Sequence, residues 1–190
     1  MSESVRAFIA IEIPESVQEI LCRIQSVLKG EGLNLRWVNP ANLHLTLKFL
    51  GDTPVDSIDA IREKMVRTAK SFEPFTLQAT GTGVFPGIKR PRVVWAGIAG
   101  NIRTLIDLHH QLDKNLAELG IPSENRPFNA HLTIGRVKGK ISTARLERAM
   151  AITRHIASDP FIVDQVILFQ SDLKPTGPVY TKLANAVLQQ

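Results

Sequence analysis

The strongest constraint on the fold is an internal repeat with an offset of 87 residues. The strings LHLTLKFLG and AHLTIGRVK share a His-Leu-Thr run, and their histidines, His44 and His131, are 131 − 44 = 87 positions apart. The same offset carries Leu21 onto Leu108, so that predicted helix falls on predicted helix without a gap. The chain is therefore predicted to contain two copies of one strand–helix–strand unit, each ending in His-Leu-Thr.

Hydrophobic periodicity predicts a mixture of strands and helices along the chain. Alternating or β-branched apolar runs predict strands, and apolar residues at helical spacing predict helices. The predicted strands cover residues 5–13, 35–38, 43–51, 75–85, 92–99, 130–137, 161–173 and 179–189. The predicted helices cover residues 14–30, 55–70, 101–120 and 143–156.

Strand geometry predicts that each histidine stands on a polar face. Successive side chains of a strand point to opposite faces, so His44 and Thr46 share one face, and so do His131 and Thr133. The leucines between them point the other way, into a core. A pseudo-two-fold relation between the two units would bring the His-x-Thr stripes together across a cleft. The alternative is that both histidines are structural residues on half-buried strands.

Two imidazoles on opposite sides of a phosphorus atom can cleave a phosphodiester without a metal ion. With ordinary pKa values of about 6.5, one can accept the proton of the nucleophile while the other donates to the leaving oxygen at neutral pH. The hydroxyls of Thr46 and Thr133 can donate hydrogen bonds to the non-bridging oxygens, where charge is held through the transition state. The two motifs are nearly equivalent, so the residues alone do not tell which histidine is the acid.

Composition excludes several other classes of protein. No apolar stretch approaches the roughly 18 residues of a membrane span, and the N-terminal residues lack the basic region of a signal peptide, so a cytoplasmic protein is expected. The single cysteine, Cys22, excludes an internal disulfide and a cysteine zinc site. His109, His110 and His155 are expected on helix surfaces. Because no carboxylate cluster has ligand spacing, no metal is expected. The sequence also gives no reason to expect an organic cofactor.

The chain is basic, with a formal net charge of +5, which favours a polyanionic partner. The alternative is an ordinary solvated basic surface. The basic residues gather in one loop and directly after the second motif: Lys89, Arg90 and Arg92, and Arg136, Lys138 and Lys140.

The paired His-x-Thr motifs resemble those of the 2H phosphoesterase superfamily. Five longer strings, RAFIAIEIPE, NLHLTLKFLGD, PRVVWAGI, RPFNAHLTIGR and LFQSDLKPTGPVYTKL, resemble the RNA 2′,3′-cyclic phosphodiesterases, also called 2′-5′ RNA ligases. The resemblance covers nearly the whole chain and implies that residues 1–190 form a single α+β domain of two duplicated, pseudo-symmetric lobes. Each lobe is implied to be an antiparallel sheet with helices packed outside, around a central cleft.

The same resemblance implies a reaction and roles for five residues. Members of the family open a terminal 2′,3′-cyclic phosphate of RNA and leave a 2′-phosphate. His44 would be the proton donor to the departing 3′ oxygen, and His131 would be the proton acceptor for water. Thr46 and Thr133 would bind the phosphate oxygens, and Arg136 would match a substrate-binding arginine of the family.

Lys48, Phe49 and Arg126 are further candidates for substrate binding. Lys48 shares the face of His44 if alternation is strict. Phe49 is placed on the core face by the same rule, although it could instead stack on a base, as could two aromatic residues elsewhere, Trp37 and Phe85.

The position of Arg136 conflicts with the role that the resemblance implies. It follows His131 by five residues, so strict alternation puts it on the opposite face of the strand. It would reach a phosphate through a bulge, from the end of the strand, or by the length of its side chain. The alternative is a structural ion pair.

Hydrolysis of RNA 2′,3′-cyclic phosphate ends by the paired histidines is the leading hypothesis for the function. Reversible 2′-5′ RNA ligation at the same site is the first alternative, with a 5′ hydroxyl in place of water. A non-catalytic RNA- or nucleotide-binding module is the second alternative. A small cyclic nucleotide phosphate is the alternative substrate, no membrane partner is expected, and the protein is expected to be a monomer.

Overall fold

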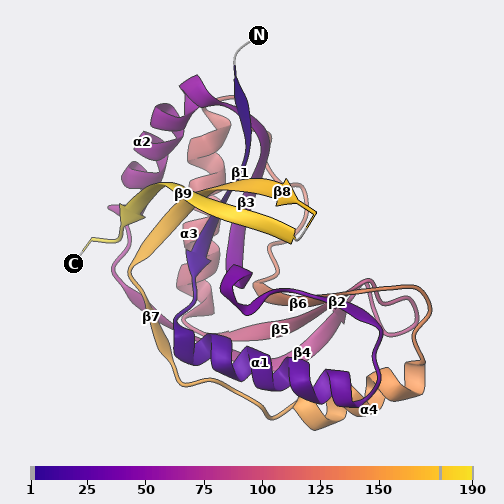
Figure 1. Ribbon diagram of the computed structural model, residues 1–190. Coiled ribbons are helices and arrows are strands. Elements are labelled where there is room, and N and C mark those ends of the chain that lie inside the picture. Colours follow the sequence, from indigo (N-terminus) through magenta and orange to yellow (C-terminus); the bar gives the residue numbers. More distant parts are fainter. Residues whose placement is uncertain (1–2, 176, 190) are drawn as a thin grey trace.

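The computed structural model describes residues 3–175 and 177–189, and it confirms the α+β fold class (Figure 1). One antiparallel sheet has four strands in the order β3-β1-β8-β9, and the other has five in the order β2-β6-β5-β4-β7. The strands are β1 Ser4–Glu12, β2 Leu35–Trp37, β3 His44–Pro54, β4 Phe75–Phe85, β5 Val93–Gly100, β6 His131–Val137, β7 Phe161–Val163, β8 Gln165–Lys174 and β9 Gly177–Val187. The helices are α1 Glu15–Gly30, α2 Ile58–Ala69, α3 Ile102–Ala117 and α4 Thr143–Thr153, with short 3₁₀ helices at Pro40–Asn42 and Val55–Ser57.

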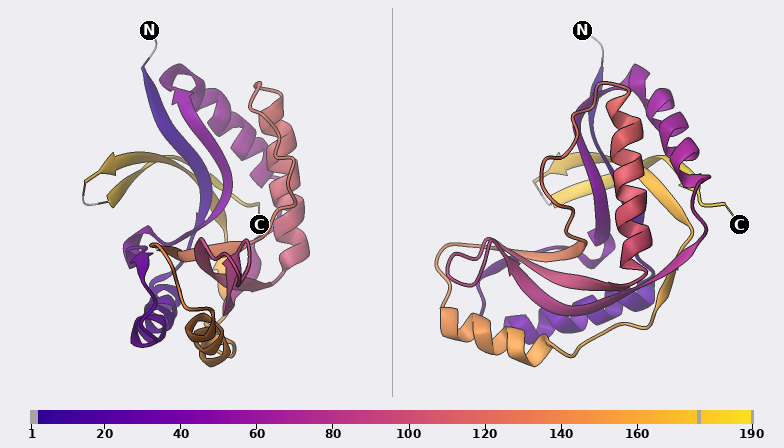
Figure 2. Two further views of the ribbon diagram at one scale, coloured as in Figure 1. Left: turned by 90° about the vertical axis from the view of Figure 1, so that its right-hand side faces the viewer. Right: turned by 180° about the vertical axis from the view of Figure 1, so that it is seen from behind.

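The helices cover one face of each sheet, as expected. Helices α2 and α3 pack on the four-stranded sheet, and α1 and α4 lie against the five-stranded sheet (Figures 1 and 2). The helices are amphipathic, and α1 buries Val17, Leu21, Ile24 and Leu28 at helical spacing. One continuous apolar core joins these helix faces to the inner faces of both sheets.

The helices are exchanged between the two sheets. Helix α1 directly follows β1 of the four-stranded sheet, yet it packs beneath the five-stranded one, where Gln25 donates from Nε2 to the carbonyls of Val38 (2.8 Å) and Ile134 (3.1 Å). Helix α3 follows β5 of the five-stranded sheet and packs beside α2 and β3. The offset of 87 residues carries the bounds of α1 onto those of α3. In each repeat the first strand and the His-Leu-Thr strand (β1 and β3, or β5 and β6) therefore lie in one sheet, whereas the helix α1 or α3 packs on the other.

The predicted strand over residues 161–173 is wrong as a single element. The structure divides it at Asp164 into β7, which pairs with β4, and β8, which pairs with β1 and β9. The carbonyl oxygen of Asp164 still has a hydrogen-bond partner, because it accepts from the N–H of Leu188 (2.7 Å). The apolar pattern continues through the break because both strands bury their side chains, so periodicity could not locate the crossing between sheets.

A β-bulge interrupts β3 at the last residue of its His-Leu-Thr-Leu run. Thr46 and Lys48 pair with adjacent residues of β1, so Leu47 between them has no partner in the register. The extra residue reverses the alternation of side chains beyond it. Lys48 therefore turns toward the helices and is buried, whereas Phe49 turns to the face of His44.

An equivalent bulge lies in β6. Thr133 and Gly135 pair with adjacent residues of β5, so Ile134 has no partner. Beyond this bulge Gly135 is buried and Arg136 lies exposed on the face of His131. Arg136 thus reaches this face through a bulge, the first of the three routes considered. Its counterpart at the offset of 87 residues is Phe49, so one repeat presents an aromatic ring where the other presents a guanidinium.

Within residues 3–175 and 177–189, no helix combines the length and the apolar character that crossing a membrane would require.

Candidate active site

Matching hydrogen bonds hold the two histidines at the starts of their strands. Nδ1 of His44 lies 2.8 Å from the carbonyl oxygen of Asn42, and Nδ1 of His131 lies 2.7 Å from that of Asn129. A carbonyl oxygen can only accept, so each Nδ1 carries the proton of this hydrogen bond. The free nitrogen is therefore Nε2 in both rings, and it is the atom available for proton transfer.

Aromatic side chains of the four-stranded sheet surround His44. Its ring centroid lies 4.7 Å from that of Phe8 and 5.2 Å from that of Tyr180, which meets it edge-on. Phe8 packs in turn against Phe169 and Ile167 in a small apolar cluster on the face away from the helices. This cluster partly shields His44 from water, and burial lowers its pKa despite the hydrogen bond to Asn42, which acts in the opposite direction.

A titration of the His44 ring is expected to show this burial directly. In the free protein the midpoint, followed by NMR of the imidazole, should lie below the ordinary value of 6.5, because the uncharged ring is favoured. Inorganic phosphate bound beside the ring should raise the midpoint, because the anion stabilises the imidazolium. In the His131→Ala variant His44 is the one histidine left at the site, so this variant assigns the imidazole signal to His44. A midpoint at or above 6.5 without phosphate would contradict the burial that the structure gives to this ring.

His131 stands beside aromatic residues of the five-stranded sheet. Phe85 meets its ring edge-on at 5.0 Å between centroids, and Trp95 lies at 6.4 Å. Trp95 has its position because its cross-strand partner is Gly83: a Cβ at Gly83 would come within 2.2 Å of the indole ring. Phe85 and Trp95 also contact each other, with 5.0 Å between their centroids. Phe85, a candidate for base stacking, thus lies at the site, and Trp37 packs against the core.

The two motifs come together because β3 and β6 contact each other, although they belong to different sheets. The segment before β3 is tied to β6, since the N–H of Val38 donates to the carbonyl of Ile134 (3.2 Å). The side chain of Asn42 also donates to the carbonyl of Pro178 at the start of β9 (2.8 Å). His44 and His131 each begin one of the contacting strands, with Thr46 and Thr133 two residues farther on the same faces.

Arg136 and Phe49 lie on the site faces of their strands. Phe49 is 63% exposed, and its ring centroid is 6.2 Å from that of Phe8, so its predicted core position is wrong; the bulge in β3 is the reason. Arg136 is close enough to Tyr180 of the other sheet to act on it: burial raises the pKa of the Tyr180 hydroxyl, and the charges of Arg136 and Arg6 oppose that rise. The positive charge of Arg136 therefore acts on a residue of the sheet that carries His44.

The predicted position of Lys48 beside a substrate is wrong. Its side chain is 3% exposed on the helix side of β3, where Nζ forms an ion pair with Asp113 of α3 and donates to the carbonyl of Pro122 (2.7 Å). The cause is again the bulge at Leu47, which strict alternation cannot anticipate. Arg126 lies exposed in the segment that leads into β6, and its role in substrate binding stays a prediction.

The predicted surface position of His109 is also wrong. Its ring is buried and stacks on Phe128 at 4.2 Å between centroids, and neither ring nitrogen has a hydrogen-bond partner among the described residues. Burial lowers the pKa of His109, while the negative charges of Glu124 and Asp113 act in the opposite direction. The segment that carries Phe128 covers a second side of helix α3. The apolar pattern of α3 alone does not reveal this contact.

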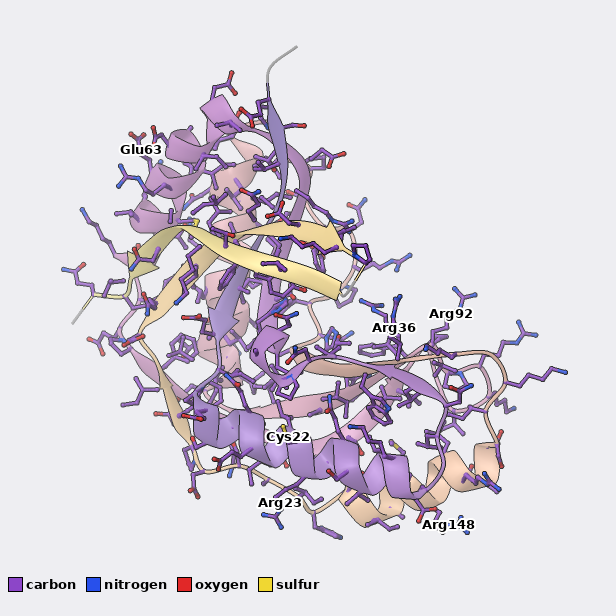
Figure 3. The ribbon with its side chains drawn as sticks, in the orientation of Figure 1. Cys22, Arg23, Arg36, Glu63, Arg92 and Arg148 are labelled. Carbon is purple, nitrogen blue, oxygen red and sulfur yellow. The ribbon has the colours of Figure 1, made fainter. Side chains whose placement is uncertain are left out.

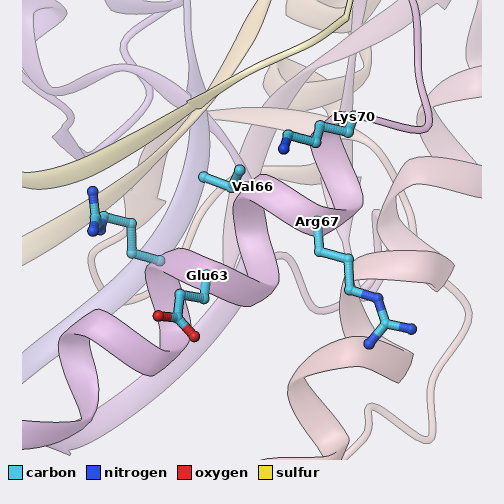
Figure 4. A pocket seen from close by; sticks show the side chains of 5 residues that line it. Glu63, Val66, Arg67 and Lys70 are labelled. Carbon is cyan, nitrogen blue, oxygen red and sulfur yellow. The ribbon is translucent and has the colours of Figure 1, made fainter.

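Two shallow pockets lie away from the histidines. One, of about 380 Å³, lies on α2 and is lined by Arg62, Glu63, Val66, Arg67 and Lys70 (Figure 4). The other, of about 260 Å³, lies on β8 and β9. Neither contains a residue of the two motifs, so the candidate site is identified by its side chains and not by the size of a cavity.

The family model described as LigT-like phosphoesterase matches this chain twice, over residues 11–95 and 97–180. The chain belongs to the LigT-like phosphoesterase family. This membership confirms the predicted 2H phosphoesterase family and the prediction of an enzyme. The double match of the LigT-like model supports the proposal that residues 1–190 are a single domain of two duplicated lobes.

Proteins of known name and structure resemble this LigT-like chain over nearly its full length. A protein of Methanothermobacter thermautotrophicus named RNA 2′,3′-cyclic phosphodiesterase is 36% identical over 179 residues, which are 94% of this chain and 96% of that protein. A solved Thermus thermophilus structure superposes with a TM-score of 0.80 and 30% identity, and covers 96% of this chain and 97% of its own. Escherichia coli LigT in complex with 3′-AMP has a TM-score of 0.76 and 27% identity, and covers 99% and 100%.

Proposed function

We propose that this protein hydrolyses the 2′,3′-cyclic phosphodiester at an RNA end to a 2′-phosphomonoester, with His44 and His131 as its proton-transfer pair. The observation that carries the proposal is the matched pair of His-x-Thr motifs. Both start contacting strands, and both fix Nδ1 on a carbonyl two residues upstream, so that Nε2 is free. The names of the relatives support the same substrate.

Both proton transfers use the free Nε2 atoms. Nε2 of neutral His131 accepts a proton from water while the water oxygen bonds to phosphorus. The bond between phosphorus and the 3′ oxygen breaks, and Nε2 of protonated His44 donates its proton to that oxygen. The hydroxyls of Thr46 and Thr133 donate hydrogen bonds to the non-bridging oxygens, and Arg136 adds positive charge.

The lowered pKa of His44 is compatible with its role as the acid once substrate is bound. Burial makes the free His44 ring a ready proton donor but leaves a smaller fraction protonated at neutral pH. The single negative charge of a cyclic phosphate beside the ring shifts this balance back toward the imidazolium. Substrate and proton therefore bind His44 cooperatively.

Reversible 2′-5′ ligation is the second candidate, because the reverse reaction uses the same groups. The 5′ hydroxyl of a second RNA then takes the place of water, and His131 accepts its proton. The exposure of Arg136 and Phe49 favours this candidate, since a site open at these positions leaves access for a second strand.

The deciding experiment follows a short RNA with a 2′,3′-cyclic phosphate end, with and without a 5′-hydroxyl acceptor. We expect a 2′-phosphate product, identified by ³¹P NMR, at the same rate in buffer containing EDTA. A ligated product in excess at modest acceptor concentration would favour the ligase. Binding without turnover, weakening steeply with salt, would replace both reactions by a non-catalytic RNA-binding module. The cytoplasmic location and the monomeric state stay predictions.

A further inference from the structure

Two arginines face each other directly across neighbouring strands of the five-stranded sheet. In the register of β2 and β6, Arg36 pairs with Arg136. Hydrogen bonds enclose this pair on both sides, because the N–H of Val38 donates to Ile134 (3.2 Å) and the N–H of Lys138 donates to Asn34 (2.9 Å). Directly paired residues of an antiparallel ladder share one face, with Cα atoms about 5.5 Å apart in such a hydrogen-bonded position.

This pair lies on the face that carries His131 and Thr133. Its neighbours along β2, Leu35 and Trp37, pack on the core, so Arg36 points to the opposite side. Figure 3 shows Arg36 and Arg92 near each other at this end of the sheet, whereas Arg23 lies on α1 at the far side of the molecule. His131, Thr133 and Arg136 form a row on one face of β6. Arg36 extends this row onto the neighbouring strand, β2.

Two like charges at directly opposed positions destabilise a sheet. Here neither guanidinium is relieved by a carboxylate, since no ion pair of the described residues includes Arg36 or Arg136. Both side chains are exposed at the end of the row next to the candidate site. Such a pair fits an anionic ligand, which would remove the repulsion when it binds.

The cyclic phosphate alone does not satisfy both charges. A 2′,3′-cyclic phosphodiester has a single negative charge, so beside Arg136 it leaves the charge of Arg36 uncompensated. An RNA strand has a second phosphodiester on the 5′ side of its terminal nucleoside, with one further negative charge.

We propose that Arg36 binds this first internal phosphodiester of the RNA, so that the preferred substrate is an oligonucleotide and not a mononucleotide. This inference rests on the proposed function and adds the length of the substrate to it. Arg136, between the two phosphates, links the reacting group to the bound strand.

The test compares three substrates by kcat/KM: adenosine 2′,3′-cyclic phosphate, the diadenosine dinucleotide with the same cyclic end, and that dinucleotide with an uncharged internal methylphosphonate. We expect the charged dinucleotide to be preferred by the unchanged protein. Arg36→Gln should lower kcat/KM for the charged dinucleotide by about three- to tenfold, the scale of one partly exposed charge pair. Its slope of log(kcat/KM) against log salt should become shallower by about 0.7, the value for one phosphate contact on a single strand.

Arg23→Gln is the matched control, because it removes one exposed arginine far from the site. It should affect the three substrates alike. Thermal unfolding of Arg36→Gln should occur at the same or a higher temperature, since the substitution relieves a like-charge pair. Equal kcat/KM for mononucleotide and charged dinucleotide in the unchanged protein, or an equal loss on all three substrates in Arg36→Gln, would overturn the inference while leaving the proposed hydrolysis intact. Absence of turnover on every substrate would instead remove the proposed function, and the inference with it.

Discussion

Replacing either His44 or His131 by alanine is expected to lower kcat for cyclic-phosphate RNA by about 10²–10⁴-fold, because each substitution removes one of two proton transfers. The double variant should lose little more than the more severe single one, since the two groups act in the same step. The measurement is single-turnover cleavage at saturating RNA. His155→Ala, an exposed histidine after α4, provides the control for removal of an imidazole.

A substrate with a better leaving group separates the two roles. A phosphodiester that has no neighbouring ribose hydroxyl, and that expels p-nitrophenolate when water attacks phosphorus, does not need a protonated leaving oxygen. On that substrate His44→Ala should recover most of its lost rate, and His131→Ala should not. The reverse pattern would exchange the acid and the base, and near-normal hydrolysis of the cyclic RNA by either variant would remove that histidine from the mechanism.

Replacing Lys48 by methionine is expected to lower the free energy of unfolding by about 3–5 kcal/mol, the cost of leaving one member of a buried ion pair without its partner. Lys48 is buried, and it connects Asp113 of α3 with the carbonyl of Pro122 in the segment before β6. Urea denaturation followed by circular dichroism measures the loss. Adding Asp113→Leu should restore most of the stability, because two apolar side chains replace the pair at similar volume.

The loss in Lys48→Met should depend on pH in a defined direction. Burial alone would raise the pKa of Asp113, but hydrogen bonds and the charge of Lys48 hold it below its ordinary value of 3.8. A lowered carboxylate pKa adds stability above pH 3.8, and this contribution disappears as the pH falls through the folded-state pKa. The difference between the proteins should therefore be largest near neutral pH. Lys182→Met, which breaks the exposed pair with Glu12, should change stability by at most about 1 kcal/mol; an equally small change for Lys48 would contradict the buried pair.

Local sequence patterns predicted the elements of this fold well where one rule acts alone. The strand over residues 75–85 has the predicted bounds, and the helix predicted over 101–120 differs from α3 only at its ends. The repeat predicted that His44 and His131 occupy equivalent positions. Both rings make the same hydrogen bond, from Nδ1 to the carbonyl two residues upstream, which belongs to Asn42 or Asn129. Such features depend on residues close in sequence or on a comparison of two strings.

The errors arise where one extra residue or a distant segment decides the outcome. Strict alternation placed Lys48 at the site and Phe49 in the core, and a single unpaired residue, Leu47, reverses both. His109 was assigned to solvent because its burial depends on Phe128, which lies in another segment. The exchange of α1 and α3 between the sheets could not be predicted either, because hydrophobic periodicity identifies a helix and its apolar face but not the sheet against which that face packs. A repeated bulge in a duplicated motif could have been suspected from Arg136, because the phosphate-binding role that the resemblance implies for it requires a position on the His131 face.

The position of β1 inside its sheet has a consequence for biosynthesis. This first strand pairs with β3 on one side and with β8 on the other, where Ala7 meets Gln170. While the ribosome is still making the middle of the protein, the β8 side of β1 remains an open edge, which is a template for pairing with other chains. In the nascent chain this edge can close only after β8, Gln165–Lys174, has been made, so one side of β1 is open to pairing with other chains until then.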